Sequence, residues 1–183
     1  MKRIASYKVN MESSWITVSA MLMGMAFFVQ AVYFLALGGM EAGTGSVIFL
    51  MILPMLLELG WFVLLKGVKL NAAGIYGIMA MAICLLLAVQ NFFGGNVAQM
   101  VLGVIAYLLI SALIFLVVGG FFPYHYFCTA ALALILLVRF LGFDLGTLRS
   151  GDWYGFLAEV PALCNLAALA CFFCGVSSRR TDK

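Results

Sequence analysis

Of the 183 residues, 66% are hydrophobic and only 9% are charged, whereas roughly 25% of the residues in a soluble domain carry a charge. A folded chain of this size must still present a surface to its solvent, so that solvent must be apolar over most of the protein, which excludes a soluble domain. The formal net charge of +3 comes from basic residues gathered near loops and chain ends, without the aromatic-interleaved basic stripe that nucleic acids need as a partner. The composition therefore predicts an all-α, polytopic integral membrane protein whose main partner is the lipid bilayer.

Six apolar stretches are long enough to cross a membrane, because a hydrocarbon core of about 30 Å needs about 20 helical residues. In chain order the predicted spans cover residues 14–38, 46–66, 72–93, 97–120, 122–142 and 153–176. Glycine pairs and the polar run 144–152 indicate the turns between them. The fourth and fifth spans are separated by a turn without Lys or Arg, so one long bent segment or a re-entrant segment is an alternative there. The short connections predict a single domain, residues 1–183.

The positions of Lys and Arg beside the spans predict the orientation. The basic residues that flank the first, second and last spans are Lys2, Arg3, Lys8, Lys66, Lys69, Arg179, Arg180 and Lys183. With six spans all of them fall on one side, and the opposite side has Arg149 as its only cation. Basic loops remain cytoplasmic, so we expect both termini in the cytoplasm (N-in/C-in). The expected location is a bacterial-type plasma membrane.

Three tryptophans support these boundaries. Trp15, Trp61 and Trp153 all fall near predicted span ends, where tryptophan side chains commonly lie at the membrane–water interface. We therefore expect all three to act as interfacial anchors.

Polar residues inside the spans are the main functional signal, because charges and amides are costly at membrane depth unless they are paired or hydrated. They are Gln30, Glu58, Gln90, Asn91, Arg139, Glu159 and Asn165. Counting about 1.5 Å per residue places Arg139 about 5 Å and Glu159 about 9 Å below the outer boundary, so an ion pair between them is expected. Glu58 and Asn165 both come out about 18 Å deep, which allows a hydrogen bond between the second and sixth spans.

Two prolines lie beside the acidic residues of the spans. Pro54 is one turn before Glu58, and Pro161 is two residues after Glu159. Each proline removes a backbone donor, and transporters use such interrupted helices to surround solutes near the middle of the membrane. We therefore expect the seven polar residues to line an outward-opening pocket for a small polar solute or a proton. The alternative is structural: an ion pair and a few amide bonds that simply hold the bundle together.

Three classes of function follow. The first is transport or binding of a small solute or ion. In size, helix number and topology the chain resembles the substrate-binding subunits of energy-coupling-factor vitamin importers. The resemblance includes no family motif, so no binding residue is carried over from that family. The second is an accessory subunit of a larger membrane complex, with partner subunits. The third, an intramembrane enzyme, is least favoured because the HExxH and GxSxG motifs and an outward-facing CxxC are missing. No metal site is expected, and the sequence leaves any other cofactor unknown.

The predicted orientation can be tested with Glu41→Cys and Lys69→Cys, each in a background without the five native cysteines. Glu41 lies in the predicted outer loop and Lys69 in a predicted cytoplasmic loop. A membrane-impermeant thiol reagent added to intact cells should therefore label position 41 and not position 69. Labelling of both positions would overturn this orientation.

Overall fold

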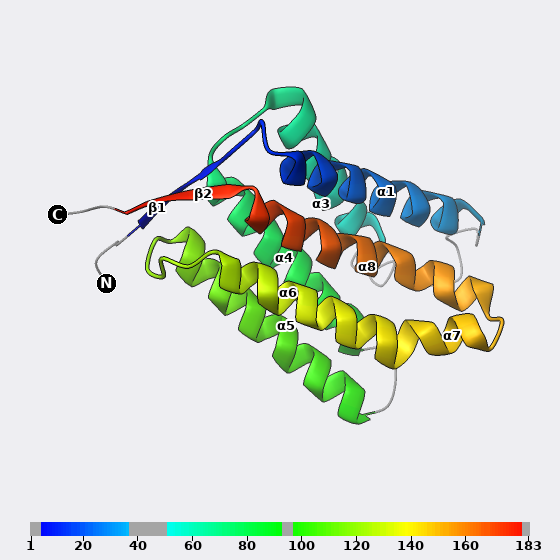
Figure 1. Ribbon diagram of the computed structural model, residues 1–183. Coiled ribbons are helices and arrows are strands. Elements are labelled where there is room, and N and C mark those ends of the chain that lie inside the picture. Colours follow the sequence, from blue (N-terminus) through cyan, green and yellow to red (C-terminus); the bar gives the residue numbers. More distant parts are fainter. Residues whose placement is uncertain (1–4, 37–50, 93–96, 181–183) are drawn as a thin grey trace.

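The computed structural model describes residues 5–36, 51–92 and 97–180 and shows a helical bundle with a short two-stranded ribbon at one end (Figure 1). In chain order the elements are β1 (Ala5–Val9), α1 (Ser14–Ala36), α3 (Leu53–Phe62), the π-helical η2 (Val63–Val68), α4 (Ala73–Phe92), α5 (Val97–Val118), α6 (Tyr126–Arg139), the π-helical η3 (Phe140–Asp144), α7 (Leu145–Arg149), α8 (Trp153–Cys174) and β2 (Val176–Arg180). Helix α1 packs against α8 and α3, α4 packs against α5, and α6 packs against α8.

Within the described residues, five helices are long and apolar enough to cross a membrane. They are Ser14–Ala36, Ala73–Asn91, Met100–Val118, Tyr126–Arg149 and Trp153–Cys174. Many of their large apolar side chains point outward, as expected where lipid replaces water as the solvent. The chain is therefore a membrane-embedded helical protein, as its composition predicts.

The second predicted span, 46–66, is helical where it is described, as α3 and η2, and its residues 46–50 lie outside the described part of the chain. At one end the Gln30 side chain donates to the Met51 carbonyl over 3.4 Å, and further along Trp61 Nε1 donates to Ser19 Oγ over 3.2 Å. Residues later in the second span thus contact residues earlier in α1. The two helices run antiparallel, so α3 and η2 return along α1 toward the end where α1 began.

Trp61 is not an interfacial anchor, contrary to the sequence prediction. Its side chain is fully buried and makes edge-on contacts with Tyr76 and Phe172, with ring centroids 5.2 Å and 4.9 Å apart. The indole fits between α1, α4 and α8 because Ser19 accepts its N–H, which removes the need for contact with water. Trp15 and Trp153, by contrast, remain 51% and 63% exposed.

The fourth and fifth predicted spans are separate helices, so the single bent segment is wrong. A turn between α5 and α6 contains Gly120, whose positive φ of 78° favours glycine. The fifth helix then continues through η3 and α7 to Arg149, well into the run 144–152 that was expected to be a turn. Within that run the chain reverses only after Arg149, at Gly151, which has a φ of 77°.

The two-stranded ribbon was not anticipated from the sequence. Strands β1 and β2 pair antiparallel, from Ala5 opposite Arg180 to Val9 opposite Val176. The Tyr7 hydroxyl also donates to the Phe122 carbonyl over 2.6 Å, which ties the ribbon to the turn between α5 and α6. Burial raises the pKa of Tyr7 to about 12, so the phenol keeps the proton it donates at neutral pH.

The basic segments of the chain meet at the end of the bundle that carries the ribbon. Lys8 on β1 pairs with Ala72, just after the loop that contains Lys69, and Val9 N–H donates to the Asn71 carbonyl over 3.2 Å. Strands β1 and β2 lie side by side at this same end in Figure 1. The α3–α4 loop and the α5–α6 turn therefore share one end of the bundle with the two tails.

The two classes of tryptophan give a stability prediction. Trp61→Ala should lower the free energy of unfolding by roughly 3 kcal/mol, because it leaves a cavity among three helices and an unpaired Ser19 hydroxyl. Trp153→Ala, at an exposed position, should cost less than about 1 kcal/mol. Thermal or denaturant unfolding of the purified protein in detergent measures both, and equal losses would contradict the buried role of Trp61.

Candidate functional site

A cavity of about 1000 Å³ lies at the end of the bundle opposite the ribbon. Residues of α1, α4, α5, α6, α7 and α8 form its wall, together with residues between these helices. Much of the wall is apolar, including Leu102, Ala106, Ile135 and Val138. Its polar side chains are Gln30, Tyr33, Gln90, Asn91, Tyr107, Arg139, Thr147, Ser150, Glu159 and Asn165. Six of the seven polar residues singled out in the sequence, all except Glu58, therefore lie around one cavity.

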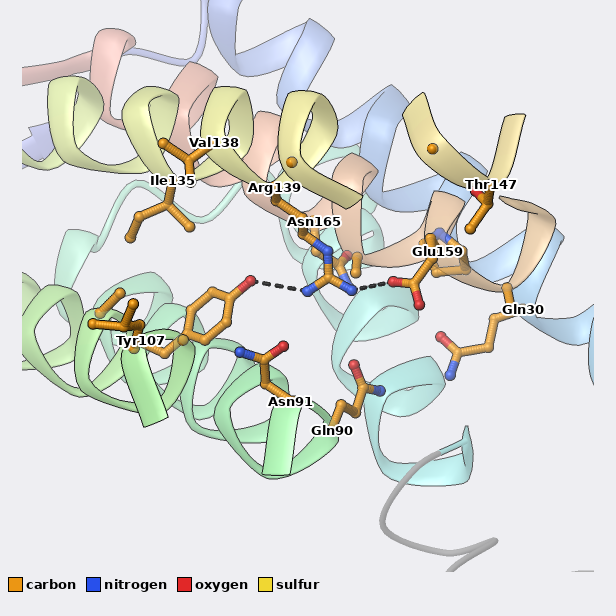
Figure 2. Close-up of a pocket in the computed structure, with 18 of the residues that line it drawn as sticks. Gln30, Gln90, Asn91, Tyr107, Ile135, Val138, Arg139, Thr147, Glu159 and Asn165 are labelled. Carbon is orange, nitrogen blue, oxygen red and sulfur yellow. Dashed lines mark hydrogen bonds and ion pairs between the residues drawn. The ribbon is translucent and has the colours of Figure 1, made fainter. Parts of the chain in front are cut away.

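Arg139 is the centre of the polar wall. One guanidinium nitrogen donates to the Tyr107 hydroxyl over 3.0 Å, and the other forms an ion pair with Glu159 (Figure 2). The expected ion pair is thus present, and it joins α6 to α8 while the tyrosine joins α6 to α5. Side-chain exposure is 15% for Arg139 and 38% for Glu159. The arginine is consequently the more deeply buried partner and depends more on the pair.

Three amides lie on the opposite side of the cavity from the arginine. Figure 2 shows the side chains of Gln30, Gln90 and Asn91 directed from α1 and α4 toward the space beside the Arg139–Glu159 pair. Asn91 packs so closely over Gly103 of α5 that a side chain at position 103 would overlap its amide. The glycine therefore allows α4 and α5 to lie close together where both line the cavity.

Glu58 lies behind this wall and not on it, which corrects its expected place in the lining. The carboxyl is fully buried, and its Oε1 accepts a hydrogen bond of 2.7 Å from the side-chain amide of Asn165. The expected link between the second and sixth spans is therefore present. Asn165 does line the cavity, so it separates Glu58 from the open space.

The two prolines have different places in their helices. Pro161 is inside α8 and lines the cavity. Because proline has no N–H, residue 161 cannot donate the helical hydrogen bond to the Leu157 carbonyl. Pro54 lies in the first turn of α3, one turn before Glu58, and the helical residues Met51 and Ile52 precede it. The carbonyl of Leu50, expected to be freed by Pro54, lies outside the described residues.

Sequence reasoning missed the hydroxyl groups of the site. Tyr107 went unnoticed because only charges and amides were sought inside the spans, although a tyrosine hydroxyl in an apolar helix also needs a partner. Thr147 and Ser150 were expected in a loop, whereas the helix reaches Arg149 and carries Thr147 to the cavity. A search for every hydrogen-bonding side chain would have found Tyr107, but the sequence held no signal for the extension of the helix.

The polar wall can hydrogen-bond a solute, and it offers no evident metal site. Among the described residues no group of three or more His, Cys, Asp or Glu side chains could hold a metal ion. His125 lies at the ribbon end against the ring of Tyr7, with centroids 5.9 Å apart, and burial lowers its pKa.

No protein-family model, curated protein or solved structure matches the chain.

The unequal burial of the ion pair predicts unequal costs of breaking it. Glu159→Gln should lower the free energy of unfolding by about 2–4 kcal/mol, because it leaves the buried Arg139 charge without its counterion. Arg139→Gln should cost about 1 kcal/mol, since the half-exposed Glu159 can turn toward water. Denaturant unfolding in detergent measures both values, and a larger loss for Arg139→Gln would contradict this asymmetry.

Proposed function

We propose that this protein binds a small organic solute in the cavity at the end of the bundle opposite its termini, as a membrane transporter or solute-binding protein. The single observation that carries the proposal is the cavity itself, a hollow of about 1000 Å³ with amide, hydroxyl and charged groups on its wall. A space of this size is at the upper end of the range for small-molecule sites. Polar side chains inside an apolar bundle are costly unless they have a use or a partner.

The composition of the wall supports an amphipathic solute. Apolar side chains such as Leu102 and Ile135 can enclose a hydrocarbon or ring portion, while Gln90 and Asn91 can hydrogen-bond polar substituents. Arg139 already has Glu159 as its counterion, so a solute need not carry a net charge. The favoured class is therefore a neutral or zwitterionic molecule with an apolar body and several hydrogen-bonding groups.

The proposed topology has six crossings with both termini in the cytoplasm of a bacterial-type plasma membrane. The antiparallel run of α3 and η2 along α1 supports a crossing in addition to the five long helices. The pairing of β1 with β2 supports an even number of crossings, because the strand before α1 and the strand after α8 lie at one end of the bundle. The basic residues at that end favour its cytoplasmic location, which would make the cavity open outward.

The cavity favours this function over an accessory subunit of a membrane complex. A subunit that acts only by packing against partners needs helix surfaces, and internal polar groups serve it best when they are fully closed on one another. Here the bundle contains a cavity of about 1000 Å³ with amide, hydroxyl and charged groups on its wall. Ligand binding therefore accounts for a feature that assembly alone leaves unexplained.

Filling the cavity tests this proposal. Ala106 lines the cavity on α5, and Ala106→Trp should occupy part of it; Ala130→Trp, at an exposed position on α6, is the matched control. A panel of amino acids, nucleosides, vitamins and sugars is screened by thermal unfolding of the purified wild type. A solute present at about 100 times its Kd stabilises the folded state by about 2.7 kcal/mol.

We expect at least one solute to stabilise the wild type and the Ala130→Trp variant, and the Ala106→Trp variant to lose that stabilisation while remaining folded. A solute that stabilises all three proteins equally would show that it binds elsewhere. No stabilisation by any member of the panel would count against the proposed function.

A further inference from the structure

Glu58 is a buried acid for which the described residues provide no cation. It is fully buried, and its one described hydrogen bond comes from Asn165. Helices α1 and α4, which pack against α3, contain no charged residue. Arg139, the cation on the cavity wall, is already bonded to Glu159 and Tyr107. A negative charge on Glu58 would therefore be isolated in an apolar interior, where it is costly.

The contact between Glu58 and Asn165 lacks one hydrogen-bond donor. Glu58 Oε2 and Asn165 Oδ1 are both buried, and neither has a hydrogen-bond partner among the described residues. An ionised carboxylate only accepts hydrogen bonds, and an amide oxygen also only accepts, so two acceptors are left over. A protonated carboxyl, in contrast, has an O–H that can donate. One proton on Oε2 would turn an unpaired acceptor into a donor for the other unpaired oxygen.

We propose that Glu58 and Asn165 form a proton-binding site behind the wall of the cavity. The proton resides on Glu58 Oε2 and is donated to Asn165 Oδ1, while Asn165 Nδ2 donates to Glu58 Oε1. The acid and the amide then form a closed ring with two hydrogen bonds, in which no polar atom of either group is unpaired. Proton binding converts the carboxylate and a hydronium ion into the carboxylic acid and water.

Asn165 gives this site access to the cavity. It is the member of the pair that lines the open space, whereas Glu58 does not reach it. A rotation of the Asn165 side chain opens the ring and exposes the Glu58 carboxyl to water in the cavity, which delivers or accepts the proton. The position of Asn165 thus links the protonation of Glu58 to whatever occupies the cavity.

A proton fits this site better than a metal ion. Hard metal ions such as Ca²⁺ and Mg²⁺ take about six or more oxygen ligands, whereas the site offers two unpaired oxygens. The elements around Glu58 carry further titratable groups, and the one cation among them, Lys66, donates to Thr17. They are Tyr33 on α1, Lys66 on η2 bonded to Thr17, Tyr76 and Cys84 on α4, and Glu159, Cys164, Cys171 and Cys174 on α8.

Infrared spectroscopy of the purified protein tests the proposal, because a protonated carboxyl absorbs apart from a carboxylate. At pH 7 the wild type should show the carboxylic acid band. Glu58→Gln should remove it and remain folded, since the glutamine amide can donate to Asn165 in place of the acid. Glu12→Gln, which removes an exposed carboxylate outside the helices, is the control and should keep the band.

Raising the pH should replace the acid band reversibly by carboxylate bands while the protein stays folded. Asn165→Val should shift the acid band, because the carboxyl loses its partner. Absence of the band in the wild type, its survival in Glu58→Gln, or its persistence at every pH at which the fold survives would each overturn the proposal.

If Glu58→Gln does not fold, ¹³C-glutamate labelling of the wild type assigns the band without that variant. The chain has only four glutamates, Glu12, Glu41, Glu58 and Glu159, so substitution of the other three isolates Glu58. A band that does not shift on labelling would again overturn the proposal. None of these measurements requires a solute, so this inference can fail while the cavity still binds one, and the reverse also holds.

Discussion

Inside a hydrocarbon solvent a polar side chain must find its partner within the chain, and this requirement organises the bundle. The partners lie on different helices each time: Trp61 donates to Ser19, Asn165 to Glu58, and Arg139 to Tyr107 and Glu159. These bonds join α3 to α1, α8 to α3, and α6 to α5 and α8. Apolar packing alone would leave neighbouring helices free to slide, because lipid tails are as apolar as leucine. The few polar pairs therefore specify which helices meet and at what depth.

The two ends of the bundle serve this requirement differently. At the ribbon end, backbone groups of the tails and turns bond one another, as where Ala5 N–H donates to the Gly120 carbonyl over 3.2 Å. At the opposite end, amides and hydroxyls line a cavity and face open space. One end is thus closed by the pairing of the two tails, and the other is hollow. The polar hollow at one end is the feature on which the proposed solute binding rests.

Within the site, the depth of a residue along its helix was the most reliable prediction. Arg139 and Glu159 were expected within one helical turn of each other in depth, and Glu58 and Asn165 at the same depth, and both pairs are in contact. A constant rise per residue is enough for such an estimate once the ends of a span are known. The side of the helix that a residue occupies was less certain, because the helices are apolar all round and show no polar face. Glu58 was for this reason assigned to the cavity wall when it lies behind it.

The sequence by itself determined the class of the protein, most helix positions and which connecting segments are basic. Composition and hydropathy give these features because they respond to the solvent and not to the neighbouring helices. Only the tertiary structure decided the rest. Trp61 became a core residue through contacts with Tyr76 and Phe172, which lie on the separate helices α4 and α8. The pairing of β1 with β2 likewise joins segments from opposite ends of the chain, and nothing in either segment alone predicts it. Long-range contacts of this kind depend on how whole helices pack, which no local pattern records.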